Sequence, residues 1–66
     1  MRKNRIREFR KQRGLTQYEL ALMFRDPVHP TYISRWERGV SAPTVDHLLE
    51  LARIFQVRPD EIYIID

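Results

Sequence analysis

Four side chains between Thr31 and Arg38 have the types and the spacing to hydrogen-bond with the edges of planar groups. Positions 31, 34, 35 and 38 carry Thr, Ser, Arg and Arg, and residues three and four apart share one face of a helix. A guanidinium presents a rigid planar fork of N–H donors, while a hydroxyl both donates and accepts. Ile33 and Trp36 fall on the opposite side. The segment predicts a helix with a polar, cationic outer face and an apolar inner one.

The element before this helix is predicted by a capping box at residues 16–19. The Thr16 hydroxyl can accept from the amide of Glu19 while the Glu19 carboxylate accepts from the amide of Thr16, a pair that contributes about 1 kcal/mol. Leu15 and Leu20 flank the box as a hydrophobic staple. We expect this helix to run to about Phe24.

The helix that carries the polar face is predicted to begin at Pro30 and to end before Gly39. His29 takes the N-cap place, and Pro30 takes the first position, where a missing amide hydrogen costs nothing. Before them, Arg25-Asp26-Pro27 cannot easily continue a helix, because a proline disfavours helical geometry at the preceding residue. Val28 is expected to turn inward.

Three further helices make the chain all-α. One covers about 5–12, with Asn4 as its cap and Gly14 as a left-handed stop. Another follows Pro43 and is capped by Thr44, and a short last helix begins at Pro59. The strongest amphipathic period of the chain predicts the buried face of the helix after Thr44: Val45, Leu48, Leu49, Ala52 and Phe55.

Length and composition restrict the function. The 66 residues allow one domain (1–66) with one small core and no second effector domain. Cysteine is absent, so no disulfide or thiolate metal site is expected. His29 and His47 lack metal-ligand spacing, and there is no glycine-rich phosphate loop. We expect no enzyme, no metal and no cofactor. Without a long apolar run or a signal peptide, a cytoplasmic protein with no membrane contact is expected.

The net charge of +3 is unevenly distributed. Residues 1–13 hold seven Lys or Arg and one Glu, while the other five Lys or Arg face eight Asp or Glu. This basic N-terminal arm (1–4) and first helix indicate either an end that faces a polyanion or a solvated face that keeps the protein soluble. Arg2, Lys3 and Arg5 are the candidates for phosphate contacts.

Five ordered sequence blocks resemble one known family. They are Leu15-Thr16-Gln17, Glu19-Leu20-Ala21, Ile33-Ser34-Arg35-Trp36-Glu37-Arg38-Gly39, Pro43-Thr44 and Leu48-Leu49-Glu50-Leu51-Ala52. Over about residues 4–62 the chain resembles the Xre/Cro-type, lambda-repressor-like helix-turn-helix family of phage repressors and bacterial regulators. The resemblance implies a compact five-helix bundle. Its second and third helices, about 16–38, would form a helix-turn-helix that enters the major groove of double-stranded DNA.

The resemblance also implies which residues contact DNA. Gln17 would meet a phosphate or a base at the groove edge. The outward positions of the recognition helix would be Pro30, Thr31, Ser34 and Arg35, and Arg38, Thr44 and the amides of 39–44 would approach phosphates. Arg10 and Glu37 match positions that form an ion pair between the first and third helices.

The chemistry of these side chains agrees with such roles but leaves alternatives. Arg35 matches O6 and N7 of guanine, a contact that discriminates by about 1–3 kcal/mol, and Thr31 can bond a base edge or touch a thymine methyl. Alternatively, Gln17 is a solvated first-turn residue, Arg35 contacts phosphate or water, and Thr31 is a second capping hydroxyl. Trp36 is expected to pack in the core.

Two departures from the family pattern affect base reading. Arg25-Asp26-Pro27 stands where the family usually has one residue, so the offset between the two helices can differ. Pro30 replaces a polar residue and offers no side-chain donor, so His29 or Tyr32 would take over part of the readout.

The sequence as a whole predicts a sequence-specific DNA-binding regulator of transcription, most simply a repressor. An antitoxin or protein–protein adaptor on the same fold is the alternative. A homodimer through Ile62, Tyr63, Ile64 and Ile65 is one expectation for the C-terminal residues; the other is that they cover the floor of the bundle. With no second domain, regulation would come from abundance, a regulatory protein partner or competition for the site.

Overall fold

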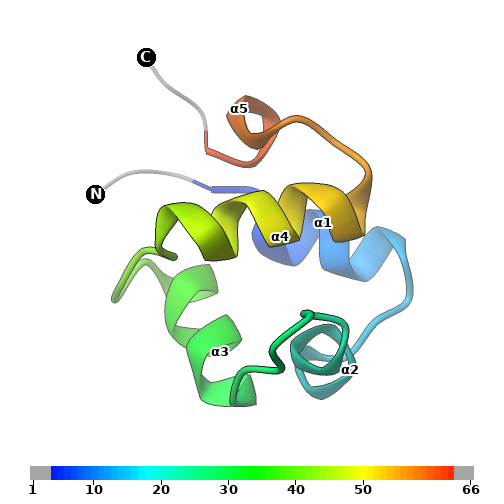
Figure 1. Ribbon diagram of the computed structural model, residues 1–66, viewed down its shortest axis with the longest axis vertical. Coiled ribbons are helices and arrows are strands. Elements are labelled where there is room, and N and C mark those ends of the chain that lie inside the picture. The colour runs from blue at the N-terminus through cyan, green and yellow to red at the C-terminus, as the bar shows by residue number, and fades with distance from the viewer. Residues whose placement is uncertain (1–3, 64–66) are drawn as a thin grey trace.

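Five α-helices lie within residues 4–63, which are the residues that the computed structural model describes (Figure 1). They are α1 (Ile6–Gln12), α2 (Gln17–Leu22), α3 (Pro30–Arg38), α4 (Val45–Phe55) and α5 (Pro59–Ile62). Within the same range the one β-type pairing is an isolated antiparallel bridge between Asn4 and Tyr63. The expected all-α five-helix bundle is therefore confirmed. None of these helices is long and apolar enough to cross a membrane.

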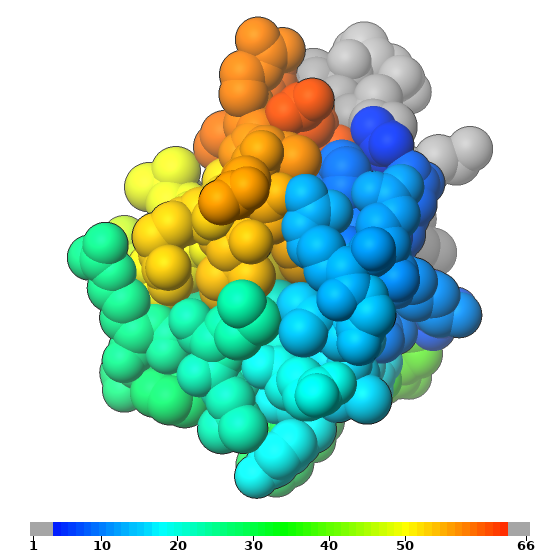
Figure 2. Space-filling view, turned by 90° about the vertical axis from the view of Figure 1, so that its right-hand side faces the viewer, coloured from blue at the N-terminus to red at the C-terminus, as the bar shows by residue number. Residues whose placement is uncertain are grey.

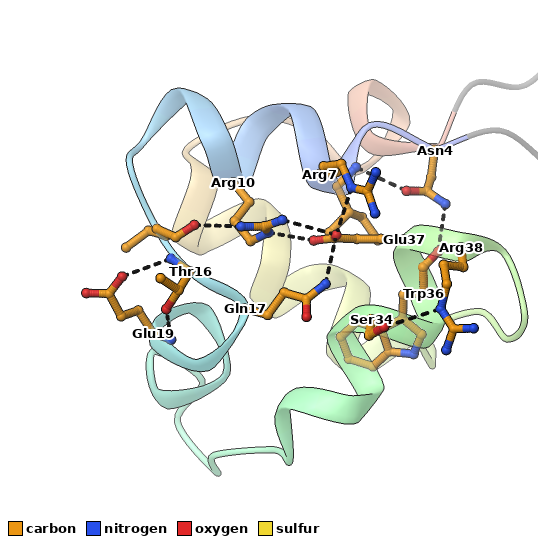
Figure 3. Close-up of polar contacts among 12 residues, drawn as sticks. Asn4, Arg7, Arg10, Thr16, Gln17, Glu19, Ser34, Trp36, Glu37 and Arg38 are labelled. Carbon is orange, nitrogen blue, oxygen red and sulfur yellow. Dashed lines mark hydrogen bonds and ion pairs between the residues drawn. The ribbon is translucent and has the colours of Figure 1, made fainter.

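The helix starts follow the predicted capping residues. The Thr16 hydroxyl accepts from the Glu19 amide at 3.0 Å, and the Glu19 carboxylate accepts from the Thr16 amide at 2.8 Å, which completes the capping box (Figure 3). The Nδ1 atom of His29 accepts from the amide of Thr31 at 3.1 Å. The hydroxyl of Thr44 caps α4 in the same manner. Local side-chain chemistry thus sets where these three helices begin.

Two predicted boundaries differ from the structure. The N-cap of α1 is Arg5 rather than Asn4, although the Asn4 side-chain oxygen still accepts from the amide of Ile6 at 3.1 Å. The second helix, α2, ends at Leu22, two residues before Phe24, where it was expected to end. Met23 is its C-cap. Phe24, which follows the helix, is 3% exposed and packs in the core.

The core receives side chains from all five helices. Figure 1 shows α4 lying across the bundle above α3 and beside α1. The Phe9 and Phe55 rings pack with centroids 5.7 Å apart, and Phe24 and Trp36 pack at 6.0 Å. Trp36 is 2% exposed, which confirms its place in the core. The buried apolar residues are Ile6, Phe9, Leu20, Ala21, Phe24, Ile33, Trp36, Leu51, Ala52, Phe55 and Ile62.

The buried face of α4 is rotated from the predicted one. Val45 and Leu49 were expected to point inward, but they are 72% and 53% exposed, whereas Leu51 is fully buried. Leu48 and Phe55 do pack in the core, as predicted. Two overlapping apolar stripes on α4 fit the helical period equally well. Packing against the rest of the bundle selects the stripe that contains Leu51.

The start and the end of the described chain lie together. The Arg5 amide donates to the Ile62 carbonyl at 2.8 Å, next to the bridge between Asn4 and Tyr63. Because Ile62 is fully buried within the bundle, its expected place in a subunit interface is wrong. Tyr63 is half-buried. The predicted contributions of Ile64 and Ile65 lie outside the described residues.

Candidate nucleic-acid interface

The outer face of α3 carries the polar side chains that the sequence predicts for it. Thr31, Arg35 and Arg38 are exposed, and Ser34 is half-buried. The Arg38 Nε–H donates to the Ser34 hydroxyl at 3.3 Å (Figure 3). Ile33, on the inner side, is fully buried. The helix thus has one side in the core and presents the other, with two guanidinium groups, to solvent.

A buried carboxylate on α3 joins this helix to α1 and α2. The Glu37 side chain is inaccessible to solvent and accepts from the Arg10 Nε–H at 2.7 Å and from Arg7 at 3.2 Å. The Gln17 amide donates to it at 3.1 Å, as Figure 3 shows. Arg10 also donates to the Leu15 carbonyl at 2.7 Å. The predicted ion pair between Arg10 and Glu37 is confirmed, and it belongs to a cluster that joins α1, α2 and α3.

The electrostatics of this cluster keep Glu37 ionised. Burial alone would raise the pKa of Glu37, but hydrogen bonds from Arg10, Gln17 and Arg7 outweigh it and lower the pKa below its ordinary value. The carboxylate is therefore charged at neutral pH and bound by three donors on two other helices. This arrangement fixes the position of α3 relative to α1 and α2.

Most of the arginines in and beside α1 have partners within the protein. Arg5 pairs with Glu8, and its guanidinium lies 4.7 Å from the centre of the Phe9 ring. Arg13 donates to the carbonyl of Phe55, near the C-terminal end of α4. Arg7 and Arg10 bind Glu37, as described above. The excess of basic residues near the start of the sequence therefore serves contacts within the protein and is not by itself evidence for a polyanionic ligand. The expected phosphate contacts of Arg2 and Lys3 lie outside the described residues, and that of Arg5 stays a prediction.

An open groove of about 960 Å³ runs beside α3. The turn between α2 and α3 forms one wall, and residues 41–44 before α4 form part of another. Trp36 and His47, with ring centroids 5.3 Å apart, lie at the groove between them. Five predicted contact residues line it: His29, Thr31, Tyr32, Arg35 and Thr44. The groove therefore brings together residues from the start of α3, its outer face and the start of α4.

The other four predicted contact residues do not line this groove. Gln17 lies toward the opposite flank of α3, where its amide is held by Glu37. Pro30 and Ser34 are half-buried, and Arg38 is exposed beside Ser34. The candidate surface thus has two parts, the groove on one side of α3 and the start of α2 on the other.

Residues that sequence reasoning did not place in the site also line the groove. His47, which the sequence excludes as a metal ligand, is half-buried with its ring edge-on to Phe24 at 5.8 Å. Ser41 and Ala42 were included only through their backbone amides. No signal in the sequence distinguishes these side chains from ordinary loop and helix residues. Among residues 4–63 no cluster of His, Cys, Asp or Glu is arranged to hold a metal ion.

A helix-turn-helix family model matches residues 6–62, nearly the whole chain. The chain belongs to the Xre/Cro-type, lambda-repressor-like helix-turn-helix family. Its helix-turn-helix consists of α2 and α3. The family is one of DNA-binding regulators of transcription.

Solved structures agree with this membership. One is the P22 c2 repressor in complex with a synthetic operator, which is 38% identical over 85% of this chain and 82% of its own, with a TM-score of 0.79. Another is a protein from Bacteroides fragilis whose assignment as a DNA-binding protein is provisional. It is 28% identical over 96% of this chain and 98% of its own, with a TM-score of 0.81. No curated protein sequence matches the chain at a significant level.

Proposed function

We propose that this member of the helix-turn-helix family is a sequence-specific regulator of transcription that represses by occupying an operator. The observation that carries the proposal is the outer face of α3, where Thr31 and Arg35 are exposed and line an open groove. On its other side, the same helix is joined to α1 by the ion pair of Glu37 with Arg10. A rigid helix with outward donors suits the major groove of DNA. A cytoplasmic location is part of the same proposal.

The proposal gives each exposed side chain a role. Arg35 reads a base, with guanine as the best match to its planar fork, and Thr31 contacts a neighbouring base edge or a thymine methyl. His29 and Tyr32, at the groove wall, supply contacts that Pro30 cannot make. Arg38 and Thr44 are assigned contacts to phosphate, Gln17 a contact to a phosphate or a base, and Ser34 a place on the face of α3 that meets DNA.

The test is a selection of bound duplexes from a random library, followed by titration of the selected and a scrambled duplex. Arg35→Ala should weaken the selected duplex by about 1–3 kcal/mol and relax the preference at one position. Arg38→Ala should weaken both duplexes alike and make the salt dependence shallower. Arg58→Ala is the matched control, because it removes an exposed arginine at the N-cap of α5, a helix that lies away from α2 and α3 (Figure 1).

Two outcomes would change the proposal. If the protein retains no duplex even at low salt, DNA binding fails and an antitoxin or adaptor role replaces it. If Arg35→Ala weakens all sequences equally, Arg35 contacts the backbone instead of a base. Repression is tested separately with a reporter whose promoter overlaps the selected site: activation on binding would contradict it.

A two-fold arrangement on a palindromic operator is part of the proposal, because such recognition spaces two α3 helices one DNA turn apart. Its subunit contact cannot use Ile62, which is buried. Sedimentation of the protein with the selected duplex should give two copies per duplex. One copy per duplex at saturating protein would remove the dimer from the proposal.

A further inference from the structure

The turn that joins α2 to α3, residues 23–29, has few hydrogen bonds of its own. The amide of Met23 donates to the Leu20 carbonyl at 3.0 Å, and the amide of Val28 donates to the Ala21 carbonyl at 3.3 Å. Between these two points the backbone turns outward through Asp26 and Pro27, both exposed. A segment of this kind keeps one conformation only when other elements bind its polar groups.

Two side chains of α4 bind the first half of this turn. The Glu50 carboxylate accepts from the Arg25 amide at 2.8 Å, and its second oxygen lies 3.6 Å from the Arg25 guanidinium. Arg53 donates to the carbonyl of Met23 at 3.3 Å. Because Met23 is the C-cap of α2, this carbonyl is one of those that a helix end leaves without a partner. Figure 2 shows the surface of residues 20–28, cyan to green, directly against the yellow and orange surface of α4.

Glu50 and Arg53 also hold each other. Arg53 donates to both carboxylate oxygens of Glu50, at 3.1 and 3.3 Å. The Glu50 side chain is 21% exposed and that of Arg53 is 45% exposed, so the pair lies at the edge of the turn rather than free in solvent. The pKa of Glu50 is lowered because Arg53 and the Arg25 amide bind its charged form. The carboxylate is therefore ready to accept from the turn at neutral pH.

The turn that these residues hold is a wall of the groove beside α3. Asp26, Pro27 and Val28 line the groove on this side. The next residues are His29, the cap of α3, and Pro30, its first residue. The φ angles of Pro27 and Pro30 are fixed by their rings, and the residues before them are restricted as well. Few backbone rotations can therefore absorb a displacement at Arg25, and the displacement is passed on to the start of α3.

We propose that Glu50 and Arg53 are positioning residues for base recognition, which set the place at which α3 begins and the width of the groove beside it. This inference rests on the proposed DNA-binding function. Neither residue lines the groove beside α3, so neither is assigned a contact with DNA. Their effect would therefore fall on the preference for one sequence over another and spare the affinity that all duplexes share.

The experiment compares Glu50→Ala with Glu50→Gln, whose side-chain oxygen can still accept from the Arg25 amide. Affinities are measured for the selected and a scrambled duplex. Glu50→Ala should lower the ratio of the two affinities by about tenfold, the scale of one misplaced base contact. Affinity for the scrambled duplex should match that of the control Asp60→Ala, which removes an exposed acid on α5 and so makes the same change in net charge. Glu50→Gln should restore most of the ratio.

A second measurement separates positioning from folding. Amide hydrogen exchange at Arg25 should speed up in Glu50→Ala while the core amides of α3 stay protected. If Glu50→Ala unfolds, Arg53→Gln serves instead and should lower the affinity ratio in the same direction. An unchanged ratio in folded variants, or an equal loss for both duplexes, would overturn the positioning role. If the wild type binds no duplex, the proposed function fails. Unchanged exchange at Arg25 in Glu50→Ala would instead contradict the view that Glu50 holds the turn.

Discussion

Replacing Arg10 by methionine tests how far the fold depends on the buried carboxylate of Glu37. The Arg10 side chain is 11% exposed, and that of Glu37 is inaccessible. Methionine keeps an unbranched, flexible side chain that can fill the space, but it removes the charge and the bond to the Leu15 carbonyl. Arg7→Met is the matched control, because Arg7 binds the same carboxylate from a side chain that is 59% exposed.

The two substitutions should differ in cost because their burial differs. Breaking a buried ion pair costs about 3–5 kcal/mol, since the remaining charge loses its partner. Arg7 and Gln17 still bind Glu37 in the Arg10 variant, so we expect the lower end, about 3 kcal/mol. Arg7→Met should cost at most about 1 kcal/mol, because solvent screens an exposed pair. For a domain of this size these values correspond to falls in Tm of about 12–24 °C and at most about 8 °C.

Thermal and urea unfolding followed by circular dichroism at pH 7 measures both costs. The lowered pKa of Glu37 adds a pH dependence: its stabilisation is fully present above the ordinary value of 4.5 and is lost as the pH falls through the lower folded value. The difference in stability between wild type and Arg10→Met should therefore narrow as the pH falls below 4.5 and through the lower folded value. Equal costs for the two variants, or a difference that does not change with pH, would refute the reasoning.

Three further predictions concern the packing and the caps. Leu51→Ala should lower the free energy of unfolding by about 2–5 kcal/mol, whereas Leu49→Ala, at an exposed site, should change it by less than about 0.5 kcal/mol; the reverse order in urea unfolding would contradict the buried face of α4. Gly14→Ala should cost about 1 kcal/mol, because its φ of +67° strains a Cβ that otherwise meets no atom within 4 Å. Gly14→Asn should cost less in the same assay. His29 should carry its ring proton on Nε2, because Nδ1 accepts from Thr31; a nitrogen spectrum with the proton on Nδ1 at neutral pH would contradict it.

Features that depend on neighbouring residues were predictable in detail. The bounds of α3, from Pro30 to Arg38, match the expected ones because a proline at the first position and Gly39 after the last act within one turn. The capping box at Thr16 is local in the same way. The ion pair of Arg10 with Glu37 is long-range, and it was predictable only through the family resemblance.

Features that depend on distant contacts were not predictable from local patterns. In sequence, Glu50 and Arg53 are an ordinary pair on a helix surface, three residues apart. The structure brings the carbonyl of Met23 and the amide of Arg25 to them. Similarly, the sequence indicates that Gln17 starts a helix, but its bond to Glu37 exists only when α2 and α3 pack together.

The sequence by itself determined that there are five helices, the caps of α2, α3 and α4, and the polar outer and apolar inner faces of α3, because these follow from interactions within a few residues and from the helical period. It also identified the family, through five sequence blocks that resemble those of the family and stand in the same order. Only the tertiary structure decided which stripe of α4 is buried, which arginines in and beside α1 have partners within the protein, and where the turn before α3 lies. Each of these depends on which groups meet across the bundle, and the choice between alternatives of similar local energy is made by packing and by the partners of buried polar groups.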